Sequence, residues 1–314
     1  MEDIGESRRG ARRYGFRKHL FRAGMIALLG AAAFAGVQAM EWPLPGATVA
    51  GNFGLNDRGR PLLGAVLSGE GEVLAAADGE VVFAFRDGDP RMSRASGFPS
   101  ALGSWTAVDH GSGLVGVYAR HGGHLASGSP RVWQGEPLAL AGSPGVFFMI
   151  LDREERRWVN PAMLAAPLPD AVPPQILGIW LADGLLGARQ VFPPWAAAQE
   201  AAQGAPPIAQ GRHSVVVAVT DALSAGMGTL LAPHLIVVSV NGAEAGRLTL
   251  DAAGARDGAL TVSRGSPTPA REVYRFHGFE AADAWFSRGQ AVIEVVAEDL
   301  AGNRTVAVAF VPVY

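Results

Sequence analysis

The alternation of apolar and polar residues along the chain predicts a protein built from short β-strands. Within residues 213–221, Val215, Val217 and Val219 recur at every second position, which is the period of a half-buried strand. Residues 146–151 are apolar at every position, and a strand of that kind is buried on both faces. The pattern therefore predicts an all-β fold without a helix-dominated domain.

Turn residues predict how these strands are joined into hairpins. Residues 105–118 are predicted to form two strands around a Gly-rich turn. The Asp78-Gly79 pair is predicted to join strands 73–77 and 80–85 in the same way. Two further hairpin turns are predicted at Asn241-Gly242 and at residues 299–303. Strands at this spacing favour antiparallel sheets, and an antiparallel sandwich in the second half of the chain.

Length and proline spacing divide the chain into two folded regions. A chain of 314 residues that is 49% hydrophobic is long enough for two domains with cores of their own. Four prolines between residues 167 and 174 mark a boundary. We therefore expect one domain over residues 41–166 and another over residues 175–314.

Residues 1–39 have the composition of an export signal. Seven basic residues precede an apolar run at 23–35, and Val37-Gln38-Ala39 offers a small-residue cleavage site. Because the run is shorter than the roughly 20 residues of a spanning helix, cleavage before Met40 is favoured over retention as an anchor. We expect no transmembrane segment after cleavage, and a periplasmic or extracellular location in the cell envelope.

Charge and composition exclude several function classes. Residues 1–39 hold seven basic and three acidic side chains, so their removal leaves 19 basic against 26 acidic residues and a net charge of −7. An acidic surface argues against a nucleic-acid partner. The chain has no cysteine, which excludes disulfides and thiolate chemistry, and its only lysine is Lys18, which excludes a phosphate-binding P-loop.

Four motifs of the first region occur in the order and spacing of one peptidase family. They are Leu74-Ala-Ala-Ala-Asp-Gly-Glu-Val-Val82, Val108-Asp-His-Gly-Ser-Gly-Leu-Val-Gly-Val-Tyr-Ala119, Gly135-Glu-Pro-Leu-Ala-Leu-Ala-Gly142 and Val159-Asn-Pro161. Residues 41–166 therefore resemble the LytM or lysostaphin-type zinc metalloendopeptidases, which implies a peptidase β-sheet core. The stretch Val295-Val-Ala-Glu-Asp-Leu-Ala-Gly-Asn303 is similar to the ending of bacterial immunoglobulin-like modules, which implies an antiparallel immunoglobulin-like β-sandwich over 175–314.

Apolar residues and one arginine stand where this family has its zinc ligands and catalytic histidines. Aligned on Gly64 and on the Val-Asn-Pro motif, the metal-ligand positions fall on Leu62, Val66 and Met149, and the catalytic positions on Phe147 and Arg120. Zinc needs nitrogen, oxygen or thiolate ligands, with Zn–N and Zn–O distances of about 2.0–2.2 Å, which aliphatic and thioether side chains do not provide. We therefore expect no bound metal, no catalytic residue and no cofactor.

Neighbouring histidines do not replace these ligands. His121 follows Arg120 directly, but a shift of one residue along a strand turns a side chain to the opposite face. His110 belongs to the scaffold motif, and we expect it to be hydrogen-bonded to backbone. A metal cluster of His110, His121 and His124 is disfavoured against an ordinary loop, because short patterns match freely.

The replaced positions predict an apolar groove with one fixed charge. Arg120, Phe147, Met149 and Leu151 are its predicted residues, and the arginine can pair with a carboxylate of a partner. Two interpretations stay open at this point. The groove binds a protein partner, or the chain fills it with its own core side chains.

These observations predict an exported, catalytically inactive LytM-type protein. The resemblance implies that it binds peptidoglycan or regulates a peptidoglycan hydrolase of the envelope, as degenerate relatives do when they activate amidases. One alternative is an active zinc metalloendopeptidase that cleaves peptidoglycan cross-links with unusual ligands. Another is a structural envelope scaffold whose sandwich is the interaction surface.

Overall fold

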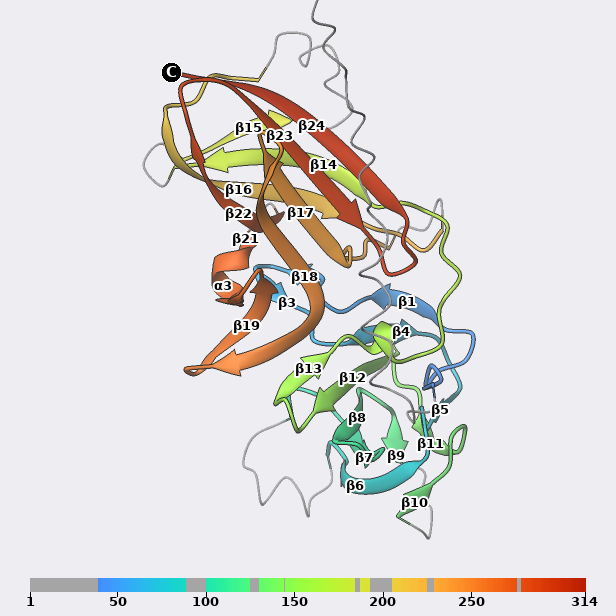
Figure 1. Cartoon of the computed structure of the whole chain (residues 1–314). Coiled ribbons are helices and arrows are strands. Elements are labelled where there is room, and N and C mark those ends of the chain that lie inside the picture. Colours follow the sequence, from blue (N-terminus) through green and yellow to red (C-terminus); the bar gives the residue numbers. More distant parts are fainter. Residues whose placement is uncertain are drawn as a thin grey trace, which may run out of the picture. The chain divides into compact units, whose positions relative to one another are not determined.

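The chain folds largely into antiparallel β-strands, as the alternating pattern predicts (Figure 1). The computed structural model describes residues 39–88, 100–124, 130–143, 145–183, 187–192, 205–224, 229–275 and 278–314. All of them belong to one compact unit, Gln38–Tyr314, and the predicted export signal lies outside the described residues except for Ala39. Within the described ranges, no helix is both long and apolar enough to cross a membrane.

The N-terminal region, residues 39–166, contributes strands β1 to β13 and a short 3-10 helix. In chain order these elements are β1 (Thr48–Gly51), β2 (Asn56–Asp57), β3 (Arg60–Pro61), β4 (Ala65–Ser68), β5 (Glu72–Leu74), β6 (Gly79–Phe85), β7 (Trp105–Asp109), β8 (Leu114–Ala119), β9 (Gly123–His124), β10 (Arg131–Val132), β11 (Pro137–Leu140), β12 (Val146–Asp152), β13 (Arg157–Val159) and η2 (Pro161–Met163). The main sheet runs β10-β6-β7-β8-β12-β13, and β4 pairs with both β1 and β12. Two small sheets, β5-β11-β9 and β2-β3, complete the region.

The predicted hairpin at residues 105–118 is confirmed and lies at the centre of the main sheet. Strands β7 and β8 pair antiparallel, with Asp109 opposite Val115. Gly111, Ser112 and Gly113 in the turn all have positive φ, a backbone conformation that glycine adopts without steric cost. The next strand, β12, is buried from Val146 to Ile150, as its apolar sequence predicts.

The predicted hairpin around Asp78-Gly79 is wrong. Strand β5 pairs with β11 in a separate small sheet, whereas β6 pairs with β7 and β10. The Asp78 carboxylate accepts a hydrogen bond from the backbone N–H of Gln134 at 2.8 Å. A Cβ at Gly79 would lie 2.5 Å from the carbonyl oxygen of Asp109, so this glycine serves the close approach of β7 rather than a tight turn. The pair therefore marks a long-range contact, which local turn chemistry does not reveal.

The C-terminal sandwich, residues 175–314, contributes strands β14 to β24 and one short α-helix. These elements are β14 (Gln175–Ala182), β15 (Ala188–Phe192), β16 (Gly211–Thr220), β17 (Leu235–Val240), β18 (Ala243–Arg256), β19 (Ala259–Arg264), β20 (Pro267–Pro269), α3 (Ala270–Val273), β21 (Tyr274–Arg275), β22 (Gly278–Phe286), β23 (Gly289–Glu298) and β24 (Arg304–Val313). One sheet runs β15-β14-β16-β22-β21 and the other β18-β17-β23-β24. The hairpins predicted at Asn241-Gly242 and at residues 299–303 are both present.

The two sheets of the C-terminal sandwich enclose one apolar core. Val215 and Val217 of β16 face Ile236 and Val238 of β17 within a single cluster of buried side chains. Val215 and Val217 are completely buried, as the alternating pattern predicts, whereas Val219 is only partly buried and Val216, on the opposite face, is buried as well. Burial of such side chains on both inner faces is what stabilises a sandwich.

The N-terminal region and the C-terminal sandwich share one continuous sheet. Strand β13 pairs antiparallel with the long strand β18, which continues into the sandwich (Figure 1). The Asn52 side chain also exchanges two hydrogen bonds of 2.8 Å with the backbone of Ala232. Polar and sheet contacts thus cross the predicted boundary at residues 167–174, and the division into domains 41–166 and 175–314 stays a prediction.

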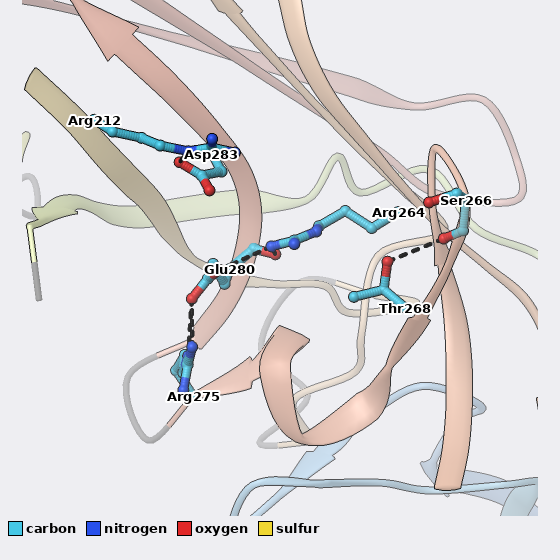
Figure 2. A network of polar contacts seen from close by, with 7 residues as sticks. All are labelled: Arg212, Arg264, Ser266, Thr268, Arg275, Glu280 and Asp283. Atoms are coloured by element: carbon cyan, nitrogen blue, oxygen red, sulfur yellow. Dashed lines mark hydrogen bonds and ion pairs between the residues drawn. The ribbon is translucent and has the colours of Figure 1, made fainter. Parts of the chain in front are cut away.

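A buried carboxylate ties three elements of the C-terminal sandwich together (Figure 2). Glu280 of β22 is 7% exposed. Its two carboxylate oxygens accept hydrogen bonds from Arg264 at 2.8 Å and from Arg275 at 2.6 Å. On the same strand, Asp283 pairs with the exposed Arg212 at 2.8 Å. Glu280 is therefore compensated by two cations, whereas Asp283 forms an ordinary surface ion pair.

Candidate functional site

The register of the main sheet brings the predicted ligand and catalytic positions of the N-terminal region together. Val66 of β4 lies directly opposite Phe147 of β12, which in turn lies opposite Ala119 of β8. Met149 is two residues further along β12 and therefore points to the same face as Phe147. Val66, Phe147 and Met149 thus share one face of one sheet, and Leu62 lies in the segment that leads into β4.

These side chains belong to one group of packed apolar residues, called the apolar cluster below. Phe147 and Met149 are 6% and 4% exposed, and the other buried members are Ala107, Val115, Val117 and Ala119. The partly buried residues that pack against them are Leu62, Val66, Leu102, Trp105, Leu151 and Trp158. All the positions predicted for the groove except Arg120 thus belong to it. The centre of the predicted groove is filled by the chain's own side chains, and only its rim is partly exposed.

Gly64 allows the segment before β4 to approach β12 closely. A Cβ at this position would lie 2.2 Å from the carbonyl oxygen of Phe148 and 2.7 Å from Cγ of Met149. Any other residue would therefore push the two segments apart. Gly64 holds Leu62 and Val66, two residues before and after it, against the buried side chains of β12.

Arg120 places a positive charge beside the apolar cluster. Its guanidinium carbon lies 5.1 Å from the centre of the Phe147 ring, a cation–π geometry. The residue is exposed, and its φ of 65° is in the left-handed region directly after β8. The position that aligns with a catalytic histidine therefore presents a permanent positive charge to solvent.

The donor chemistry of this site does not suit zinc. The side chains of Leu62, Val66 and Met149 offer carbon atoms and one thioether sulfur, whereas protein zinc sites use imidazole, thiolate and carboxylate ligands. Arg120 cannot act as a general base, because a guanidinium stays protonated in proteins. The arrangement can bury apolar surface and present a cation.

The histidines of the N-terminal region have structural partners. His110 Nδ1 lies 3.0 Å from the carbonyl oxygen of Asp78, and its Nε2 lies 3.1 Å from the Tyr118 hydroxyl. Because a carbonyl only accepts, Nδ1 carries the proton and Nε2 accepts from Tyr118. Burial lowers the pKa of His110, in keeping with a neutral ring. The expected hydrogen bond to backbone is confirmed.

His121 does not take over a ligand position. Its Nε2 lies 3.1 Å from Oγ1 of Thr106, and both residues are buried. Thr106 is adjacent to Ala107, which belongs to the apolar cluster, so the two side chains point to opposite faces of β7. His121 therefore lies on the other side of the sheet, as the one-residue shift predicts. The side chain of His124 lies outside the described structure.

A cluster of three aspartates, which the sequence did not predict, forms a second candidate site. Asp170, Asp221 and Asp299 each offer a carboxylate oxygen, and these oxygens all lie within 4.8 Å of one another. Burial first, and then the charges of Asp170 and Asp299, raise the pKa of Asp221 to about 7, while the backbone N–H of Ala222 acts in the opposite direction. The available signal was one aspartate at the end of the predicted strand 213–221 and another at the start of the predicted turn 299–303. Pairing in space determines that they meet.

Comparisons with known proteins give partial matches. A family model without a descriptive name matches residues 199–314, less than half of the chain. No curated protein matches the sequence. The solved structure of the SpoIIQ-SpoIIIAH pore forming complex is similar at 19% identity and a TM-score of 0.34, over 41% of this chain and 92% of that chain.

A zinc containing peptidase from Vibrio cholerae is a second solved structure with partial similarity. The identity is 19% and the TM-score 0.31, over 42% of this chain and 41% of that chain. The chain thus spans less than half the length of the Vibrio peptidase.

Proposed function

We propose that the chain is an exported cell-envelope protein with a catalytically inactive LytM-type domain, which binds peptidoglycan or regulates a peptidoglycan hydrolase. The observation that carries this proposal is the apolar cluster. Leu62, Val66 and Met149 occupy the family's three metal-ligand positions, and they meet on one face of the main sheet. Because the three side chains lie together, as metal ligands would, their location supports the alignment with the LytM-type motifs. Because none of them offers a suitable metal donor, they argue against catalysis.

The residues that the N-terminal region shares with the LytM-type motifs hold the scaffold rather than a metal. His110 accepts from Tyr118 across the central hairpin, and a Cβ at Gly116 would lie 2.6 Å from His110 Nε2. Asn160 caps η2 by accepting from the N–H of Ala162 at 3.1 Å. These scaffold contacts are present although the zinc ligands of the family are not. They therefore support a domain that has kept the LytM-type fold and lost the peptidase reaction.

The strand order of the C-terminal sandwich supports the immunoglobulin-like assignment. With β14, β16, β22 and β21 as strands A, B, E and D, the first sheet has the order A-B-E-D. With β17, β23 and β24 as C, F and G, the second sheet contains the order C-F-G. Modules of this kind are frequent in extracellular proteins, which agrees with the proposed export.

Metal content and peptidoglycan cleavage test the loss of the reaction. Protein purified without chelator is expected to contain far less than one equivalent of zinc by elemental analysis. It is also expected to leave the cross-links of purified sacculi intact by chromatography of the released fragments, because the ligand positions offer no donor atoms. One equivalent of zinc, together with cleavage that a chelator stops, would establish the active endopeptidase instead.

Arg120→Glu tests whether the rim of the apolar cluster contacts the partner. We expect binding to purified sacculi or to purified envelope amidases to fall at least about tenfold, because reversing a charge at a contact opposes a carboxylate of the partner. The melting temperature should fall by no more than about 2–4 °C, since Arg120 is exposed and loses only its cation–π contact with Phe147. Co-sedimentation and surface plasmon resonance measure the two interactions.

Arg256→Glu is the matched control for this charge reversal. Its side chain is 70% exposed at the end of β18 and does not belong to the apolar cluster, so the variant should bind as the wild type does. If Arg120→Glu binds both ligands as tightly as this control, the apolar cluster is only core. The scaffold alternative, with the C-terminal sandwich as the interaction surface, would then be favoured.

A further inference from the structure

Three aspartates meet where the proline-rich segment passes one end of the C-terminal sandwich. Asp221 directly follows β16, Asp299 directly follows β23, and Asp170 lies in the segment before β14. Each offers one carboxylate oxygen, and the three oxygens lie within 4.8 Å of one another. Three separate segments of the chain therefore each contribute one carboxylate to the same place.

Two of these charges are buried, and no side-chain cation of the described chain compensates them. Asp221 is 6% exposed and Asp299 is 3% exposed, whereas Asp170 is half-buried. Among the described residues, none of the three takes part in an ion pair with an arginine or histidine. A buried carboxylate without a counter-charge is strongly unfavourable, because water no longer solvates its charge. Within the described structure, the buried carboxylates of this cluster therefore lack a counter-charge.

The hydrogen bonds of the three carboxylates leave one oxygen of Asp221 without a partner. Asp299 accepts from the backbone N–H of Asn303 at 2.9 Å and from its side-chain amide at 2.8 Å. Asp170 accepts from the N–H of Val172 at 3.0 Å. In the described structure, Oδ1 of Asp221 is fully buried and has no hydrogen-bond donor. Buried polar atoms are normally hydrogen-bonded or coordinated, so this oxygen is available to coordinate a cation.

A cavity gives an ion access to the aspartates. All three line a cavity of about 380 Å³, whose wall also includes Asn52, Trp42 and His234. His234 Nδ1 lies 3.1 Å from a carboxylate oxygen of Asp251, although the two atoms do not form a hydrogen bond. Water can fill such a space and complete the coordination of an ion held by the carboxylates.

We propose that Asp170, Asp221 and Asp299 bind one calcium ion. The donors are exclusively carboxylate oxygens, which suit hard cations rather than zinc or copper. Calcium accepts six to eight oxygens in irregular arrangements at about 2.3–2.6 Å, whereas magnesium demands a near-ideal octahedron. Carboxylates from three separate segments, with water in the remaining positions, match the requirement of calcium.

Calcium at this point joins the proline-rich segment to the sandwich. Asp170 lies in that segment, and the side-chain amide of Asn303 also donates to its backbone carbonyl at 3.4 Å. The ion stabilises only the folded chain, because the three aspartates are far apart in the sequence and converge only on folding. Binding is therefore expected to raise the melting temperature.

Calcium titration of the full chain tests the proposal. After removal of divalent ions with a chelator, calorimetry should detect one equivalent of calcium. The melting temperature should rise by at least about 5 °C at a calcium concentration about 100 times the dissociation constant. Magnesium should produce a smaller shift. No heat and no shift up to millimolar calcium would overturn the proposal, as would tighter binding of magnesium.

The variant Asp221→Asn distinguishes a calcium site from a cluster in which the aspartates are simply protonated. Without calcium, this isosteric variant should melt at or above the wild-type temperature, because it removes a buried uncompensated charge. With calcium, it should lose the shift. Asp257→Asn is the control, since the side chain of Asp257 is 94% exposed, and it should respond as the wild type does. An undiminished calcium shift in Asp221→Asn would overturn the proposal.

Asp170→Asn provides a second variant should Asp221→Asn fail to fold. Asp170 is half-buried outside the strands, so its replacement should spare the fold. It should weaken calcium binding at least about tenfold, because affinity depends on the number of charged ligands. Unchanged affinity would exclude Asp170 from the site and contradict the proposal.

Discussion

A variant that carries Leu62→His, Val66→Asp and Met149→His is expected to bind zinc, which the wild-type chain should not do. Val66 lies opposite Phe147, so Met149, two residues further along β12, is a diagonal neighbour of Val66. Such neighbours lie about 7–8 Å apart, within reach of side chains that meet at one ion. Leu62 packs into the same apolar cluster. The three substitutions restore the ligand types that the LytM-type resemblance implies.

The expected effect of zinc on this variant is large. Without metal, two imidazoles and a carboxylate among apolar side chains should destabilise the fold by several kcal/mol. Structural zinc contributes on the order of 10 kcal/mol in small zinc domains, which exceeds that cost. Zinc should therefore raise the melting temperature of the variant strongly, and equilibrium dialysis should find one equivalent bound.

A triple variant with Leu62→Asn, Val66→Asn and Met149→Gln is the matched control. It places similar polarity at the same positions but provides no imidazole or carboxylate, so it should be destabilised without rescue by zinc. If zinc shifts the melting temperature of both triple variants equally, the three side chains do not come close enough together to bind one zinc ion. The alignment behind the proposed function would then lose its structural support.

Glu280→Ala is expected to lower the free energy of unfolding by about 3–5 kcal/mol. Glu280 is buried between Arg264 and Arg275, and its removal leaves two guanidinium groups without their counter-charge (Figure 2). The Arg264 side chain is only 18% exposed, so water cannot fully replace the carboxylate. Denaturant unfolding monitored by circular dichroism measures the loss.

Asp283→Ala, on the same strand, controls for the loss of an acidic side chain. Its partner Arg212 has a side chain that is 72% exposed, and exposed ion pairs contribute about 0–1 kcal/mol. The control should therefore unfold close to the wild type. A loss below about 1 kcal/mol for Glu280→Ala as well would mean that both arginines regain water, and would contradict a stabilising role of the network.

Local chemistry was sufficient to predict most hairpins but not all strand partners. Asn241 and Gly242 both have positive φ in the turn between β17 and β18, which their residue types allow. Asp78-Gly79 has a similar turn composition, yet β5 and β6 belong to different sheets. The difference arises because Gly79 serves a close approach to Asp109, a contact that only the folded chain makes.

The sequence by itself determined which chemistry is possible at the positions that align with LytM-type zinc ligands. Leu62, Val66 and Met149 have no suitable donor atoms in any fold, so their identity alone argues against a metal centre. Alternation and turn residues likewise determined that the chain is all-β, because a period of two places apolar side chains on one face of a strand.

The tertiary structure decided which distant residues act together. It filled the predicted groove with Phe147 and Met149, because β4 and β12 pair in a register that buries both. It also brought Asp170, Asp221 and Asp299 to one point. The ends of strands converge according to the order in which the strands pair, and that order depends on long-range packing rather than on the local pattern of residues.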